Sequence, residues 1–263
     1  MPQSRLVSSF RRIAGILLVT LPCLLAAPAL GMAQPPTVLA MRIDGTITPV
    51  VADHLEEGLR TAEQDGNAAT LIEIDTPGGL LQSTREIVQD VLAADVPVIV
   101  HVAPSGARAA SAGAYITLSA HVAAMAPGTH IGAGTPVTGQ GEEASEKVVN
   151  DSVAFAVAIA EQRGRSTDFT REMVRDGTAV SDQEALRVKA VDLMAPRDAL
   201  LTELDGRSVM VGADGAEREV VLQTPGAQIV EHDLGFFGEL RQWLASPERA
   251  YVTAAISSPD VMR

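Results

Sequence analysis

Cysteine is almost absent from this chain of 263 residues, which contains only Cys23. That residue lies in an apolar run over residues 13–30. Three arginines precede the run, and the small residues Gly31 and Ala33 follow it. This order is typical of a secretory signal peptide, so we expect residues 1–33 to be removed and the mature chain to be exported, to the periplasm or the extracytoplasmic face of the membrane. An uncleaved anchor helix is the alternative, but two prolines within the run disfavour a stable membrane span.

A mature chain without cysteine forms no disulfide bond and offers no thiolate to a metal ion. None of the five histidines forms an H-x-x-x-H pair, so the sequence predicts no metal site. Residues 128–141 are rich in glycine, but they contain neither G-x-x-x-x-G-K-[ST] nor a clear G-x-G-x-x-G after a strand. We therefore expect no metal and no nucleotide cofactor.

Positive charge is also scarce, and the formal net charge is −13. The predicted signal peptide contains three arginines and no acidic residue, so its removal takes the net charge from −13 to −16. Such an acidic protein is poorly suited to binding nucleic acid or anionic lipid by charge. After residue 34 no apolar run is long enough to cross a bilayer.

Aromatic residues make up only 3% of the chain, so alanine, valine, leucine and isoleucine must fill most of the core. Their spacing alternates between that of strands and that of helices through residues 38–126. This alternation predicts an α/β fold with a largely parallel sheet flanked by helices. We expect strands at 38–43, 68–75, 96–103 and 121–127, and helices at 51–66, 80–95, 111–120 and 145–164.

The predicted secondary structure changes beyond residue 200. Residues 208–222 read as a hairpin that turns at Asp214 and Gly215. Residues 236–252 look like an amphipathic helix, which we expect to dock on the rest of the chain, with a membrane surface or another protein as the alternative. We therefore divide the chain into a signal peptide (1–33), an α/β domain (34–205) and a C-terminal extension (206–263).

A candidate nucleophile lies in "GARAASAGAYITLSA", residues 106–120, where Ser111 is surrounded by very small residues. Small residues let another segment of backbone approach closely. The N-terminus of the predicted helix favours developing negative charge near that hydroxyl. The turn "DTPGGL" follows a different strand and adds the bare amides of Gly78 and Gly79. Because the carboxyl ends of parallel strands meet at one edge of the sheet, we expect both turns to face one crevice. The alternative for Ser111 is that it simply begins an alanine-rich helix and has no catalytic role.

A serine nucleophile needs a base, and the residues alone leave two candidates open. His130 lies in the glycine-rich loop, whereas His121 opens a strand and is expected to be buried. Lys147 is the only lysine between residues 109 and 162. A lysine acts as a base only when its amine is uncharged, which partial burial favours. The alternative is a solvated lysine paired with Glu143 or Asp151.

Five motifs carry a resemblance to a known family: "DTPGGL", "GARAASAGAYI", "MAPGTHIGAGTPV", "KVVNDSVAFAVAIAEQRGR" and "EALRVKAVDLMA". In this order and spacing they resemble the NfeD/stomatin-operon membrane serine proteases. These are relatives of signal peptide peptidase A within the ClpP/crotonase superfamily, and the resemblance covers roughly residues 36–245. It implies a ClpP/crotonase-like fold of stacked ββα units and a homo-oligomeric protein associated with the membrane.

The resemblance also assigns roles to residues. It implies that Ser111 is the nucleophile of a Ser-Lys dyad and Lys147 its general base. It implies that the oxyanion is held by Gly78, Gly79 and the amide of Ala112. The substrate it implies is a stomatin-like membrane protein.

Apolar residues near the predicted crevice, chiefly Leu80 and Ile131, suggest hydrophobic peptides as substrates. Two other functions stay open. One is a crotonase-like enzyme that acts on an acyl thioester, for which a carboxylate base is expected in the crevice. The other is an inactive assembly partner of a stomatin-like protein.

Overall fold

The computed structural model describes residues 35–242, except residues 140, 143, 214, 236, 237 and 239. The predicted signal peptide lies outside this part of the chain. So do Asp214 of the predicted hairpin turn and most of the predicted helix at 236–252.

A six-stranded sheet forms the centre of the fold, and every neighbouring pair of strands is parallel. In spatial order its strands are β11 (Gln228–Glu231), β1 (Thr37–Asp44), β2 (Ala69–Asp75), β3 (Val98–Val102), β5 (Val122–Met125) and β8 (Leu193–Met194). All five residues of β3 are buried. A parallel strand buried this completely must be covered on both faces of the sheet, and the predicted α/β architecture is confirmed.

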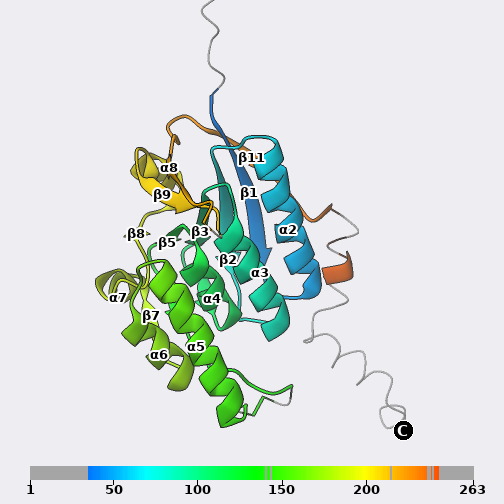
Figure 1. The fold of residues 1–263 in the computed structure, drawn as a ribbon, viewed down its shortest axis with the longest axis vertical. Helices are drawn as coiled ribbons and strands as arrows, with labels where there is room; N and C mark the ends of the chain where they lie inside the picture. The colour runs from blue at the N-terminus through cyan, green and yellow to red at the C-terminus, as the bar shows by residue number, and fades with distance from the viewer. Residues whose placement is uncertain are drawn as a thin grey trace, which may run out of the picture. The chain divides into compact units, whose positions relative to one another are not determined.

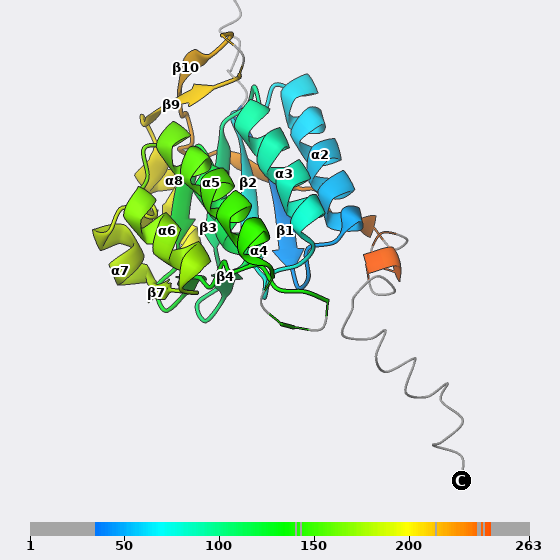
Figure 2. The ribbon, with the colours of Figure 1, turned by 60° about the horizontal axis from the view of Figure 1, so that its bottom comes forward.

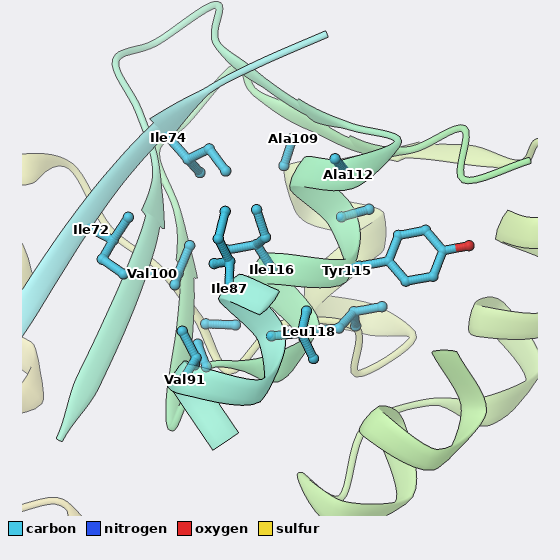
Figure 3. Packing of buried hydrophobic residues seen from close by; sticks show 14 of the residues in the cluster. Ile72, Ile74, Ile87, Val91, Val100, Ala109, Ala112, Tyr115, Ile116 and Leu118 are labelled. Atoms are coloured by element: carbon cyan, nitrogen blue, oxygen red, sulfur yellow. The ribbon is translucent and has the colours of Figure 1, made fainter. Parts of the chain in front are cut away.

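One face of the sheet carries the larger core. It is covered by α2 (Pro49–Gln64), α3 (Leu81–Ala93), α4 (Ala112–Ser119), α5 (Glu146–Gln162) and α6 (Thr167–Arg175), which Figure 2 shows in front of the strands. Alternate strand residues such as Ile72, Ile74 and Val100 point into this core and meet Ile87 and Ile116 from the helices (Figure 3). Within the described residues no helix is both long enough and apolar enough to cross a membrane.

The opposite face carries a second core, built from the intervening strand residues. Leu71 and Ile99 point to this side because successive side chains alternate across a strand. They are covered by α8 (Arg197–Leu204) and by the hairpin of β9 (Ser208–Val211) and β10 (Arg218–Val221). The hairpin is confirmed. The division at residue 205 stays a prediction, and the strands beyond it pack on this face or, in the case of β11, pair with β1 (Figure 1).

A small second sheet was not predicted. It has the order β4 (Arg108–Ala110), β6 (His130–Gly132) and β7 (Ala179–Ser181), with β4 parallel to β6 and β6 antiparallel to β7. Strand β6 lies within the segment that we expected to be a loop. An isolated bridge between Thr76 and Ala109 attaches this sheet to the end of β2. The second sheet therefore brings the turn after β4 beside the turn after β2. The short helix α7 (Asp182–Arg187) follows β7.

Candidate active site

Ser111 lies where β4 ends and α4 begins, in a strained backbone conformation with φ +50° and ψ −116°. Its amide donates a hydrogen bond of 2.9 Å to the carbonyl of Gly132 in β6, and its carbonyl accepts one of 2.9 Å from Ala114. Strained, non-glycine conformations of this kind cost of the order of 1–3 kcal/mol and cluster at functional sites. A serine on a sharp strand-to-helix turn presents its hydroxyl outward, as a nucleophile requires.

The small residues around Ser111 allow two turns to touch. Gly78 has φ +118°, and a Cβ atom placed on it would lie 2.7 Å from Cβ of Ser111. A Cβ atom on Gly113 would lie 2.5 Å from Cγ2 of Thr76. Only glycine fits such approaches, which explains the composition of both motifs. The expectation that the two turns face one crevice is confirmed, because Gly79 and Ser111 line the same cleft.

The backbone amides beside Ser111 are not equivalent. The Gly78 amide donates to Oγ1 of Thr76 at 3.0 Å, and the Thr76 hydroxyl donates to the carbonyl of Gly45 at 2.6 Å. Within the described part of the chain, the amides of Gly79 and Ala112 have no hydrogen-bond partner. Two of the three predicted oxyanion donors are therefore free, whereas the amide of Gly78 is already engaged.

Ser111 opens into a cleft of about 420 Å³. The residues that line it are Thr46, Pro77, Gly79, Leu80, Leu81, Thr84, Ser111, Ala112, Tyr115, Gly134, Pro136, Val137, Thr138, Gly139, Ala144 and Val148. Three of its residues are large and apolar yet exposed, namely Leu80 at 50%, Val137 at 61% and Val148 at 37%. A concentration of exposed apolar side chains around one concave surface indicates a site for an apolar ligand.

The two residues predicted to contact substrate have different positions. Leu80 lines the cleft. Ile131 does not, because it is fully buried in the larger core and its strand, β6, pairs on both sides. The structure corrects the expectation for Ile131, because a side chain packed in the core is not accessible to a ligand.

Lys147 lies in the first turn of α5 with an exposed side chain, and it is not one of the cleft-lining residues, although Val148 is. Within the described residues no hydrogen bond joins Lys147 to Ser111. Asp151, one turn further along α5, pairs with Arg85 of α3 rather than with Lys147. Glu143, the other expected partner, lies outside the described residues. The dyad therefore stays a prediction.

The histidines considered as bases lie elsewhere. His121 accepts a hydrogen bond from the amide of Val98 at 3.1 Å, and burial together with Arg163 and Arg165 lowers its pKa to about 3. His130 is exposed at the start of β6. Among the described residues that line the cleft there is no histidine, aspartate or glutamate. Nor do the described residues contain a group of three or more potential metal ligands.

The position of Thr76 directly before the Gly78–Gly79 turn predicts that it fixes the geometry of that turn, and its hydrogen bonds agree. Sequence reasoning did not single out Tyr115. Tyr115 lies in α4, four residues after Ser111, and lines the same cleft; its hydroxyl donates to the carbonyl of Gly134 at 2.9 Å.

Residues 37–205 match the family described as NfeD1b, N-terminal domain. The chain belongs to this family. It is 34% identical over 222 residues to the membrane-bound protease PH1510 of Pyrococcus horikoshii, a match that covers 82% of this chain and 50% of the relative. The chain spans about half the length of the curated relatives it matches.

Solved structures place this NfeD-family chain in the ClpP-like fold. A lysine-to-alanine mutant of the 1510-N membrane-bound stomatin-specific protease, in complex with a substrate peptide, superposes with a TM-score of 0.75 at 32% identity, covering 80% of this chain and 98% of that one. A serine-to-alanine mutant of the same protease gives 0.70 at 33% identity and covers 75% and 97%. ClpP1 from Listeria monocytogenes shares the fold, with a TM-score of 0.52 at 22% identity over 61% of this chain and 94% of that one.

Proposed function

We propose that this chain is a serine endopeptidase in which Ser111 is the nucleophile and Lys147 the general base. The observation that carries the proposal is the strained Ser111 turn, which lies in an apolar cleft beside the free amides of Gly79 and Ala112. The relatives support it as well, because the curated one is named a protease and the solved mutants of 1510-N replace a serine and a lysine.

The proposed reaction begins when the uncharged amine of Lys147 takes the proton from Oγ of Ser111. The oxygen then attacks a peptide carbonyl, and the amides of Gly79 and Ala112 stabilise the negative charge that develops. Lys147 returns the proton to the leaving amine, and water hydrolyses the acyl-enzyme. The Lys147 side chain is exposed, so the proposal requires its amine to come within hydrogen-bond reach of Ser111 when a peptide binds. Catalytic hydrogen bonds often tighten only in the bound complex. Gly78 contributes space rather than a donor.

The proposed substrate is a hydrophobic segment of a stomatin-like membrane protein. The cleft supports this choice, because Leu80, Val137 and Val148 expose apolar surface around Ser111. The relative supports it as well, since 1510-N is described as a stomatin-specific protease. We further propose that the protein is exported, works at the extracytoplasmic face of a membrane and forms a homo-oligomer.

Mutation of the two residues tests the proposed function. We expect Ser111→Ala and Lys147→Ala each to lower kcat/KM on hydrophobic peptides at least ~10³-fold, because a nucleophile and its base act as a unit. The matched control is Lys189→Ala, which removes the chain's one other lysine and should leave hydrolysis unchanged. Circular dichroism checks that each variant is folded. A folded Ser111→Ala protein with wild-type hydrolysis would exclude the proposal.

Labelling by a fluorophosphonate separates this proposal from the other two functions. We expect wild-type protein to be labelled at Ser111 and the Ser111→Ala variant to remain unlabelled. An acyl-thioester enzyme of the crotonase kind would need a carboxylate base, and the described cleft residues include none. An inactive assembly partner would bind a stomatin-like protein equally well with and without the Ser111 hydroxyl.

A further inference from the structure

We propose that Arg85 is a positioning residue of this site: it engages the carboxylate of Asp151, keeps that carboxylate away from Lys147, and holds the first turns of α5 beside the cleft. This inference rests on the proposed function, since it concerns the base of the proposed dyad. Arg85 was not singled out from the sequence, and it does not line the cleft.

Arg85 makes two contacts that join α3 to α5. Its guanidinium forms an ion pair with Asp151, and its Cζ atom lies 4.4 Å from the centroid of the Phe155 ring. The side chain of Arg85 is 28% exposed and that of Asp151 is 66% exposed, so the guanidinium is partly shielded from water whereas the carboxylate is not. An ion pair combined with a cation–π contact fixes a guanidinium more firmly than an isolated surface pair does.

The contacts continue from Phe155 towards the cleft. The Phe155 ring stacks on Tyr115 of α4, with centroids 6.0 Å apart and an interplanar angle of 18°. In Figure 3 the Tyr115 ring points away from the isoleucines of the core. Its hydroxyl donates to Gly134, and both Tyr115 and Gly134 line the cleft. Arg85 is therefore one end of a continuous set of contacts that reaches the wall of the cleft.

Helix geometry places Lys147 on the same face of α5 as these contacts. Lys147, Asp151 and Phe155 follow one another at intervals of four residues, which lie one above the other on a helix. On α3, Leu81 precedes Arg85 by the same interval and lines the cleft. Lys147 therefore belongs to the face of α5 that meets Arg85, one turn closer to the start of the helix.

The charge arrangement matters because a base must be uncharged before it can take a proton. A carboxylate four residues from a lysine on a helix favours the charged ammonium form. Asp151 has this spacing, but its carboxylate is paired with Arg85 instead. The other acidic residues near Lys147 in sequence are Glu142, Glu143 and Glu146, and all three remain in every variant below. Glu142 and Glu146 are exposed.

The pH dependence of hydrolysis tests the inference in four proteins: wild type, Arg85→Met, Asp151→Asn and the double variant. We expect Arg85→Met to move the alkaline rise of kcat upward by roughly half to one pH unit, with kcat near pH 7 falling roughly 3- to 10-fold and KM little changed. Asp151→Asn in the same chain should restore the profile, because the freed carboxylate is gone. Arg171→Met, which breaks the exposed pair with Asp168 on α6, is the matched control and should leave the profile unchanged.

Chemical labelling of lysine gives a readout that does not require hydrolysis. The chain contains two lysines, Lys147 and Lys189, so acetylation can be followed at both by peptide mass. We expect Arg85→Met to slow acetylation of Lys147 relative to Lys189 near pH 7, and the double variant to recover the wild-type ratio. Lys189 is an internal standard because it is exposed and outside the α3–α5 contacts.

The outcomes separate the two proposals. If Arg85→Met lowers kcat equally at every pH, and Asp151→Asn does not rescue it, Arg85 is merely structural and the inference is wrong. Unchanged profiles and an unchanged labelling ratio would also overturn it, whereas the function proposed for Ser111 would stand. If the Ser111→Ala variant hydrolyses peptides as fast as the wild type, the proposed function fails. The acetylation ratio of Lys147 to Lys189 then still decides whether Arg85 acts on the Lys147 amine.

Discussion

Ser111 adopts its conformation because three segments meet at one residue. The Gly132 carbonyl holds its amide, α4 begins immediately after it, and Gly78 approaches its side chain from the turn after β2. None of these constraints is available to an isolated helix start. The position of the Ser111 hydroxyl thus depends on Gly132 and Gly78, and each of these is separated from Ser111 in sequence by more than one helix or strand.

Gly78→Ala tests the close approach between the two turns. The added Cβ would meet Cβ of Ser111 at 2.7 Å, so one of the turns must move. We expect kcat/KM to fall at least ~10²-fold, because displacing a turn that holds an oxyanion donor has the effect of removing that donor. Gly106→Ala is the matched control, since it adds a methyl group at φ +92° with nothing within 4 Å.

The two glycine variants share the strain of placing alanine at positive φ, which costs roughly 1 kcal/mol of stability. Urea denaturation measures that common cost, and peptide hydrolysis measures the difference between them. A Gly78→Ala enzyme as active as Gly106→Ala would show that the contact with Ser111 has no role in catalysis.

At the scale of elements, α2 and α3 place three carboxyl groups close together. Asp90 of α3 is partly buried, and this burial, together with Glu56 and Glu86, raises its pKa to about 6. The folded protein therefore binds a proton at Asp90 more readily than the unfolded chain does. The stability that this group contributes is complete below its unfolded pKa of about 4 and is lost as the pH rises through about 6.

Asp90→Asn should therefore stabilise the protein at pH 7 to 8. We expect a gain of about 1 kcal/mol, a value discounted for the partial exposure of the group, and a gain close to zero at pH 4. Urea denaturation at the two pH values measures it. Glu86→Gln, which removes one neighbouring charge, should give a smaller gain of the same sign. A stabilisation that is equal at pH 4 and pH 8 would rule out charge as the cause.

At the scale of the whole molecule, three histidines have lowered pKa values because they are buried: His54, His101 and His121. The pKa of His121 is lowered to about 3, and its ring accepts a hydrogen bond from the amide of Val98 in the central sheet. Below its ordinary pKa of 6.5 the unfolded chain binds a proton at this position and the folded protein does not. Stability is therefore complete above pH 6.5 and falls as the pH drops from 6.5 towards 3.

We expect this single group to lower the free energy of unfolding by about 2 kcal/mol at pH 5 relative to pH 8. The measurement is urea denaturation against pH in the Asp90→Asn background, because Asp90 acts in the opposite direction over part of this range. His121→Gln should reduce the slope, since an amide carbonyl can accept from Val98 without titrating. An equal slope in both proteins would contradict the assignment to His121.

Much of the architecture was predictable because its evidence is local. The helices α2, α3 and α5 and the strands β1, β2, β3 and β5 each carry a hydrophobic period long enough to recognise, and the structure confirms them. Strands β4, β6, β7 and β11 were missed. The first three are only three residues long and contain alanine or glycine, and β11 is an exposed edge strand of four residues. None of them is long enough to show a hydrophobic period.

The α/β class, the family, the nucleophile candidate and its small neighbours were recognisable without a structure, because each depends on motifs or hydrophobic spacings within short segments. Only the tertiary structure decided that Ile131 is buried, that the Gly78 amide bonds to Thr76, and that Asp151 pairs with Arg85 instead of Lys147. The physical reason is that burial and charge pairing depend on which group approaches from elsewhere in the chain. Arg85 and Asp151 are 66 residues apart, and their meeting is a property of how α3 and α5 pack.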